Sequence, residues 1–196
     1  MNNKPLESDW LKHEKEEEEI FKTMSCSELL SYLNQHWETL LDGPQIYLAG
    51  LAIDKGCQEV APYLLRCLKN TDPYNRWRAL SGLGELGCRE YRSLFIDLHL
   101  NDSDDVVRQK ALLHLSELFR SERDREILQL ALSAWDNPNS SIAMRLTAGA
   151  VMMYQLDIPH DEQGAPAWWD EEEEDLQHPF ILRAVEETRE TLLQAT

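Results

Sequence analysis

The chain has 196 residues, of which 42% are hydrophobic and 28% charged, and this balance predicts a globular protein with one sizeable core or a short repeat array. Its formal net charge of −17 argues against nucleic-acid binding, which depends on Lys and Arg clustered at phosphates. No apolar run approaches about 18 residues, so we expect no membrane span. The N-terminus lacks the apolar segment of a secretory signal, so we expect a cytoplasmic protein.

The chain begins with a polar, acidic arm over residues 1–24, which we expect to be helical. Ser25 and Glu28 then have the spacing of a capping box, in which each side chain bonds the backbone N–H of the other residue. This predicts a helix from Ser25 to about Leu41. The Asp-Gly-Pro segment 42–44 is predicted to end that helix, with its proline beginning the next one.

Residues 102–118 have the pattern of one complete helix. Short acidic and hydroxyl side chains at 102–105 suit an N-terminal cap, because their oxygens accept bonds from free backbone N–H groups. Apolar residues follow at Val107, Ala111 and Leu115, a spacing that places them on one helical face.

The same pattern recurs along the chain. A small residue is found in the first helix of each unit, and an arginine precedes it by three residues in all units but the first, where Ile46 takes that place. The alanines are Ala49, Ala79, Ala111 and Ala148, and the arginines are Arg76, Arg108 and Arg145. Second amphipathic stretches lie at 59–68, 91–100 and 125–135. A period of 30 to 37 residues with one helix pair in each unit predicts an α-solenoid.

These units resemble HEAT repeats, and in particular the short HEAT-like repeats of phycobilisome lyases. The residues that carry the resemblance, over roughly 44–158, are Asp72, Arg76 and Ala79, and then Asp102, Val107, Arg108, Ala111 and Leu115. The resemblance implies an all-α fold, a short α-solenoid of about four helix pairs. It also implies structural roles for Arg76, Arg108, Arg145, Ala79, Ala111 and Ala148, with the arginines bonding acidic or carbonyl groups of the adjacent unit.

The regular spacing fails after Ile158. We therefore divide the single predicted domain into an arm (1–24), helical repeats (25–158), an acidic Trp-containing loop (159–179) and a C-terminal capping helix (180–196). The net charges of residues 1–24, 25–158 and 159–196 are −3, −5 and −9. The last fifth of the chain therefore holds more than half of the excess negative charge.

No motif indicates catalysis, a metal site or a cofactor. The glycines at 82, 84 and 87 match GxGxxG, but a dinucleotide site needs this motif between a strand and a helix, so we interpret them as helix-packing and helix-ending residues. The histidines form no HExxH motif, and the four cysteines have no CxxC pair, so we expect the cysteines to be buried apolar residues. Arg76, Arg78, Arg89 and Arg92 could form a basic patch, but we expect Glu85, Glu90 and Asp97 to balance it.

The sequence therefore favours a non-catalytic module that binds a basic protein, most concretely a bacterial immunity protein that neutralises a toxin such as a nuclease. Tryptophans in loops often anchor interfaces, and neighbouring carboxylates steer basic partners. The predicted partner-binding residues are Trp168, Trp169, Asp170, Glu171, Glu172, Glu173, Glu174 and Asp175. Two alternatives remain open: a general scaffold or adaptor, and a bilin-handling protein whose groove would use Tyr74, Trp77, Cys88 and His114.

Overall fold

The computed structural model of the protein describes residues 19–158 and 173–194. These residues form α-helices and short 3-10 helices, with no strand among them. The predicted all-α class and the short α-solenoid are confirmed. The chain forms two compact units, Met1–Leu86 and Gly87–Thr196.

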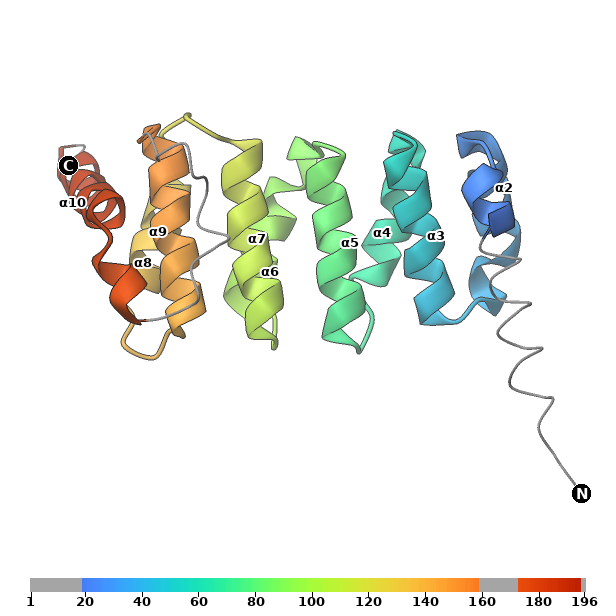
Figure 1. Ribbon diagram of the computed structural model, residues 1–196, viewed down its shortest axis with the longest axis horizontal. Helices are drawn as coiled ribbons and strands as arrows, with labels where there is room; N and C mark the ends of the chain where they lie inside the picture. The colour runs from blue at the N-terminus through green and yellow to red at the C-terminus, as the bar shows by residue number, and fades with distance from the viewer. Residues whose placement is uncertain (1–18, 159–172, 195–196) are drawn as a thin grey trace, which may run out of the picture. The chain divides into compact units, whose positions relative to one another are not determined.

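In the first unit, residues 19–23 are helical, and helix α2 follows and packs against α3. Helices α3 and α5 pack side by side, and α4 packs against both of them (Figure 1). The elements in chain order are α2 (Cys26–His36), η1 (Trp37–Thr39), α3 (Asp42–Asp54), η2 (Gln58–Val60), α4 (Ala61–Cys67) and α5 (Pro73–Glu85).

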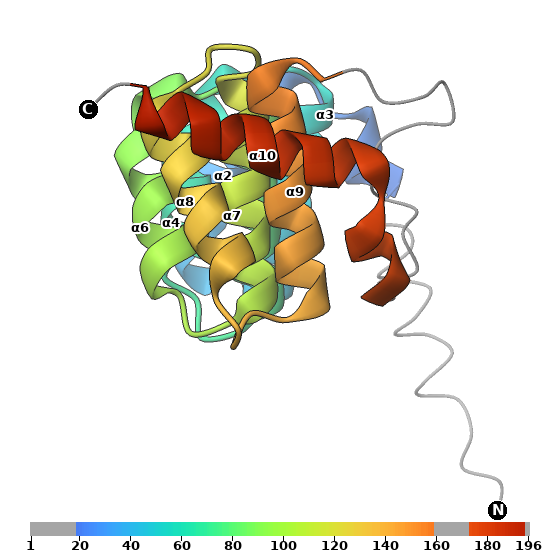
Figure 2. The same ribbon diagram turned by 90° about the vertical axis from the view of Figure 1, so that its left-hand side faces the viewer.

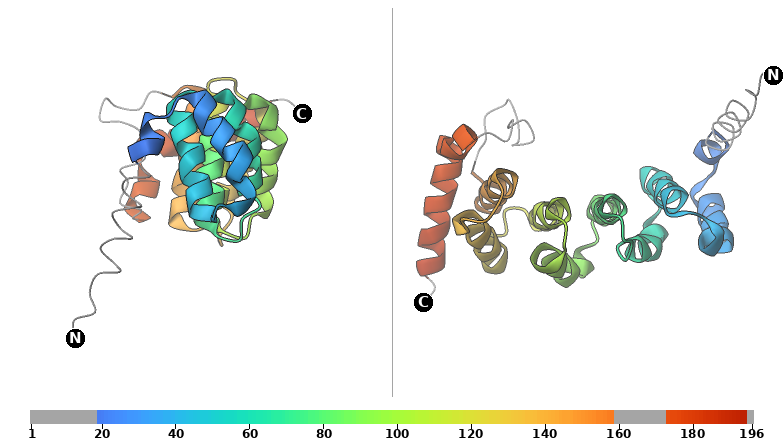
Figure 3. Two further views of the ribbon diagram at one scale, coloured as in Figure 1. Left: turned by 90° about the vertical axis from the view of Figure 1, so that its right-hand side faces the viewer. Right: turned by 90° about the horizontal axis from the view of Figure 1, so that it is seen from below.

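In the second unit, α7 and α9 pack side by side in one layer, with α6 and α8 in the other (Figure 3). Helix α10 crosses α8 and α9 obliquely and covers them, as a capping helix does (Figure 2). The elements are η3 (Arg89–Tyr91), α6 (Arg92–Asn101), α7 (Asp105–Leu118), α8 (Arg125–Asp136), α9 (Ile142–Leu156), η5 (Glu173–Gln177) and α10 (Pro179–Leu193).

Side-chain caps set where several helices begin. The capping box of Ser25 and Glu28 is present at the start of α2. In the predicted helix over 102–118, Asp104 is the residue that caps α7, and its carboxylate accepts from the backbone N–H groups of Val106 and Val107 at 2.9 and 3.1 Å. Each such cap contributes about 1 kcal/mol to helix stability.

The predicted end of the first capped helix, at about Leu41, is wrong. Helix α2 ends at His36, and the short η1 turn carries the chain to Thr39. The Asp-Gly-Pro segment 42–44 does not terminate this region but forms the first turn of α3. Proline is tolerated there because the first turn of a helix has free N–H groups in any case.

Glycines of the GxGxxG match act in helix packing and helix ending. A Cβ added to Gly82 on α5 would meet the terminal methyl of Ile53, and would lie 3.1 Å from Leu64 Cδ1. Gly87 follows α5 with a φ of +70°, a conformation that favours glycine at a helix end. The absence of side chains therefore lets α5 approach α3 and α4 closely.

The expectation that all four cysteines are buried apolar thiols is wrong for two of them. Cys26 and Cys57 form a disulfide, with Cα atoms 5.7 Å apart, while Cys67 and Cys88 are free and buried. The separation of 31 positions between Cys26 and Cys57 hides this proximity in the sequence. It arises because the start of α2 lies against the end of α3, a contact that spacing alone does not reveal.

Candidate protein-binding surfaces

The arginines in the repeated register bond the turns that precede their own helices. Arg76 Nη1 donates to the carbonyl oxygens of Asn70 and Thr71 at 3.1 and 3.0 Å. Arg108 Nη1 donates to the carbonyl oxygen of Asp102 at 2.8 Å, and its Nη2 pairs with Asp105 at 2.8 Å. The side chains of Arg76 and Arg108 thus tie the turn before each helix to the helix that follows it.

The third arginine of the register has a different neighbour. The Arg145 guanidinium lies over the Trp135 ring of α8, 5.1 Å from its centroid, in a cation–π contact. Its unit begins with Asn139, Ser140 and Ser141 instead of aspartates, and Ser141 Oγ caps α9 by accepting from the Met144 N–H.

The alanines of the repeat are fully buried at helix contacts. Ala79, Ala111 and Ala148 each have 0% of their surface exposed. A larger side chain at any of them would overpack the contact, which typically costs about 1–3 kcal/mol. The structural roles expected for these alanines and for Arg76, Arg108 and Arg145 stay a prediction.

The predicted partner-binding residues fall largely outside the described part of the chain. Trp168, Trp169 and residues 170–172 lie there, and so do the side chains of Glu173 and Glu174. Residues 173–177 of the predicted loop form the 3-10 helix η5, in which Asp175 is half-buried and Leu176 is buried. The role of the acidic and tryptophan residues therefore stays a prediction.

The four residues considered for a bilin groove belong to different units. Tyr74 and Trp77 pack edge to face on α5 of the first unit, with ring centroids 5.3 Å apart. Cys88 and His114 belong to the second unit, where His114 Nδ1 lies 2.8 Å from a Glu117 carboxylate oxygen. Burial raises the pKa of the Cys88 thiol, followed by the charge of Glu90, so this sulfur is protonated at neutral pH and is a poor nucleophile.

Two of the four arginines considered as a basic patch, Arg89 and Arg92, form ion pairs with carboxylates other than the predicted ones. Arg92 donates to both carboxylate oxygens of Asp124 at 2.9 and 2.8 Å and to Glu126 at 2.6 Å. These bonds, that to Glu126 above all, raise the pKa of Arg92. Arg89 pairs with Glu122. The partners come about 30 residues later in the chain, from the turn before α8 and its first residues.

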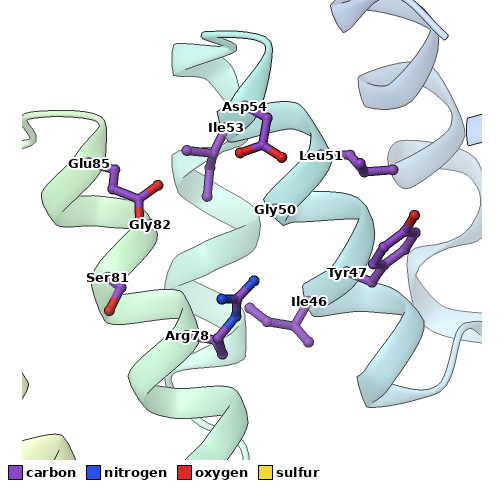
Figure 4. A pocket seen from close by; sticks show the side chains of 10 residues that line it. All are labelled: Ile46, Tyr47, Gly50, Leu51, Ile53, Asp54, Arg78, Ser81, Gly82 and Glu85. Carbon is purple, nitrogen blue, oxygen red and sulfur yellow. The ribbon is translucent and has the colours of Figure 1, made fainter. Parts of the chain in front are cut away.

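A hollow of about 170 Å³ lies between α3 and α5 (Figure 4). Ile53 and the two glycines Gly50 and Gly82 form its floor. Asp54 and Glu85 stand at one end, on opposite helices, and the rest of its lining is Ile46, Tyr47, Leu51, Arg78 and Ser81.

A second hollow, of about 330 Å³, lies in the second unit among α6, α7, α8 and the start of α9. His99 there bonds the Arg108 carbonyl through Nδ1 at 3.1 Å, and burial lowers its pKa, so the ring is neutral. Burial raises the pKa of Asp105, but the bonds from Ser141 and Gln109 and the charge of Arg108 outweigh it and lower the pKa overall. The three ionisable side chains that line this hollow, His99, Asp105 and Arg108, are thus engaged within the protein.

Sequence reasoning missed the hollow on α3 and α5. The available signal was the pair of small residues Gly50 and Gly82, each followed after four or three residues by a carboxylate, Asp54 or Glu85. Residues three or four apart share a helix face. The spacing could have placed each carboxylate beside its glycine, but not one helix opposite the other.

The described residues hold no metal-binding group of three or more His, Cys, Asp or Glu side chains. Within the same ranges, no helix has the length and apolar character needed to cross a membrane.

Comparison with known families agrees with this architecture. HEAT repeats match residues 45–116 and 61–148, which together span more than half of the chain. The chain belongs to the HEAT-repeat family. Neither a curated protein nor a solved structure matches it significantly. HEAT repeats in general mediate protein–protein interaction, so membership indicates a protein-binding or scaffold module, while the phycobilisome lyase type is not confirmed.

Proposed function

We propose that this HEAT-repeat protein is a non-catalytic module that binds a basic protein through carboxylate-rich surface. The observation that carries the proposal is its charge, a net −17 of which −9 falls in residues 159–196. Excess carboxylates attract a basic partner over a distance of about 10 Å at moderate salt, and this attraction speeds its encounter. Binding of a basic surface also relieves the repulsion among those carboxylates.

The pairing of the arginines strengthens this reading of the charge. Arg66, Arg89, Arg92, Arg108, Arg183 and Arg189 each pair with a carboxylate of the chain. A carboxylate beside each of these cations offsets its positive charge, so the attraction that a phosphate or an acidic partner meets there is weakened. The chain has 36 Asp and Glu residues but only 19 Lys and Arg residues. Carboxylates therefore remain in excess even where every cation is paired, and the net charge presented to a partner is negative.

The concrete form of the proposal is an immunity protein that neutralises a basic toxin, such as a nuclease. A nuclease needs cationic side chains to bind phosphate. An acidic module that covers those side chains would block substrate binding without any chemistry of its own, and the tryptophans Trp168 and Trp169 would anchor the complex as interface hot spots.

The test is capture of partners from the native cell by the full chain, with mass spectrometry, followed by measurement of the purified complex. The matched variant replaces Trp168 and Trp169 by Ala and residues 170–175 by their amides. We expect a partner of basic composition, an affinity that falls steeply with salt, and a loss of at least about tenfold in the variant. Inhibition of the partner's nuclease or other toxic activity would support the immunity form.

Two results would oppose the proposal. A captured partner with an acidic or neutral surface, bound equally well at low and high salt, would indicate a general scaffold or adaptor. Unchanged affinity in the variant would remove residues 168–175 from the interface.

A further inference from the structure

The hollow between α3 and α5 combines an apolar floor with charged ends. Its floor is open because Gly50 has no side chain, and a Cβ added there would find only Arg78 Nη2 within 4 Å, at 3.8 Å. Ile53 lies between the two carboxylates, on the α3 side (Figure 4). An unbranched aliphatic stem could therefore lie along the floor between the helices, in contact with apolar surface.

The charges of the hollow are not neutralised by one another. Arg78 lines the same space as Asp54 and Glu85, yet among the described residues no hydrogen bond or ion pair joins it to either of them. Its guanidinium instead lies over the Trp77 ring, 5.6 Å from the centroid. Both carboxylates are exposed, so one end of the hollow presents two negative charges on facing helices and the other end presents N–H donors.

We propose that this hollow receives a lysine or arginine side chain of the protein partner. The stem lies over Gly50 and Ile53, and the cationic head binds Asp54 and Glu85 together. Arg78 donates to a carbonyl oxygen of the partner's backbone next to that residue. The basic character of the partner rests on the proposed function, whereas the fit of a cation on an aliphatic stem follows from the hollow itself.

An anion fits this hollow less well, because it would meet two carboxylates for one guanidinium. A wholly apolar side chain would cover the carboxylates and strip water from them without supplying a partner, which is unfavourable. A cation with an aliphatic stem covers the apolar floor with its stem and binds the carboxylates with its head. A planar guanidinium can reach two carboxylates at once through its several N–H donors.

The hollow is the better of the two spaces for such a contact. In the second unit, Asp105 already accepts bonds from Arg108, Gln109 and Ser141, so a partner's cation would have to displace them. Asp54 and Glu85 need no such exchange. Their exposure also means that binding removes little water from the carboxylates before the new contacts form.

The test uses the full chain labelled with ¹⁵N and titrated with N-acetyl-arginine amide. The uncharged isostere N-acetyl-citrulline amide is the matched probe. We expect shifts that concentrate at the amides of Gly50, Asp54, Gly82 and Glu85, and binding about tenfold weaker for citrulline, because its head lacks the charge. Asp54→Asn and Glu85→Gln should each weaken arginine binding about fivefold, while Glu59→Gln, the same chemical change elsewhere in this unit, should not.

Shifts spread evenly over the acidic surface, absence of shifts at the hollow, or equal binding of the two probes would overturn the inference. The same variants separate it from the proposed function. If the captured basic partner binds Asp54→Asn/Glu85→Gln as tightly as the natural chain, the hollow is not its docking site although the module still binds a basic protein. If no basic partner exists but the probe binds selectively, the proposed function fails and the hollow's preference stands.

Discussion

Gly149→Ala should loosen the docking of α10, because the glycine is a contact point between α9 and α10. A Cβ added at Gly149 would lie 2.8 Å from Ile181 Cγ2, and 3.4 and 3.5 Å from its Cγ1 and Cδ1. Ile181 is fully buried, so the branch cannot swing into solvent. A β-branched side chain is also stiff at χ1, and Cγ2 can move only if the helix moves with it.

The magnitude follows from two opposed effects. Alanine is favoured over glycine within a helix by about 1 kcal/mol. Overpacking a well-filled contact costs about 1–3 kcal/mol, and a distance of 2.8 Å places this contact toward the upper part of that range. We expect Gly149→Ala to lower the free energy of unfolding by about 1 kcal/mol.

Gly50→Ala is the matched control, since Gly50 occupies the same place in its repeat, one residue after the aligned alanine. The nearest atom to its added Cβ is Arg78 Nη2 at 3.8 Å, an ordinary van der Waals contact. This substitution should raise the free energy of unfolding by about 0.5–1 kcal/mol, so the two glycines should respond with opposite signs.

Urea unfolding followed by circular dichroism measures both variants. Ile181→Ala alone should cost about 2–5 kcal/mol, and Gly149→Ala/Ile181→Ala should be more stable than the sum of the single changes predicts, by about 2 kcal/mol, the overpacking penalty that is relieved. If Gly149→Ala is as stable as Gly50→Ala, or if the double variant shows no coupling, then the close approach of α9 and α10 is not what disfavours a side chain at position 149.

Three further predictions concern buried polar groups and cysteines. Gln155→Leu should destabilise the second unit by about 3 kcal/mol in urea unfolding, because the fully buried amide bonds three backbone groups, two at the end of α7 and one before α8. A milder loss would mean that water satisfies those groups in the variant. Burial lowers the pKa of His99, so the free energy of unfolding should be highest above the ordinary pKa of 6.5 and fall as the pH drops below it. His99→Gln should flatten this pH dependence, whereas an unchanged pH profile would assign the dependence to other groups. Burial, followed by the charge of Asp42, raises the pKa of Cys67 to about 11, so iodoacetamide should alkylate this thiol at least about 100-fold more slowly in the folded than in the unfolded chain. Peptide mapping without reductant should recover Cys26 linked to Cys57.

Local signals in the sequence located most helices. The capping box of Ser25 and Glu28 and the aspartates before α7 act within one helical turn, so their geometry follows from spacing alone. Predictions were weaker where two local rules compete. The Asp-Gly-Pro segment 42–44 suits both the end of one helix and the start of the next, and packing selected the start of α3.

The repeated alanines and arginines determined the fold class, because a helix pair with one apolar face must stack on its neighbours to bury that face. The same residues identified the repeat family but carried little about purpose.

Tertiary structure alone decided which distant groups meet. The ion pairs of Arg89 and Arg92 join residues more than 30 positions apart, and the Cys26–Cys57 disulfide spans a similar distance. The hollow of Asp54 and Glu85 likewise exists only because α3 and α5 lie side by side. Periodicity sets which face of a helix is buried, but the partner residue across that face depends on the offset and rotation between helices, which arise from close packing of whole surfaces.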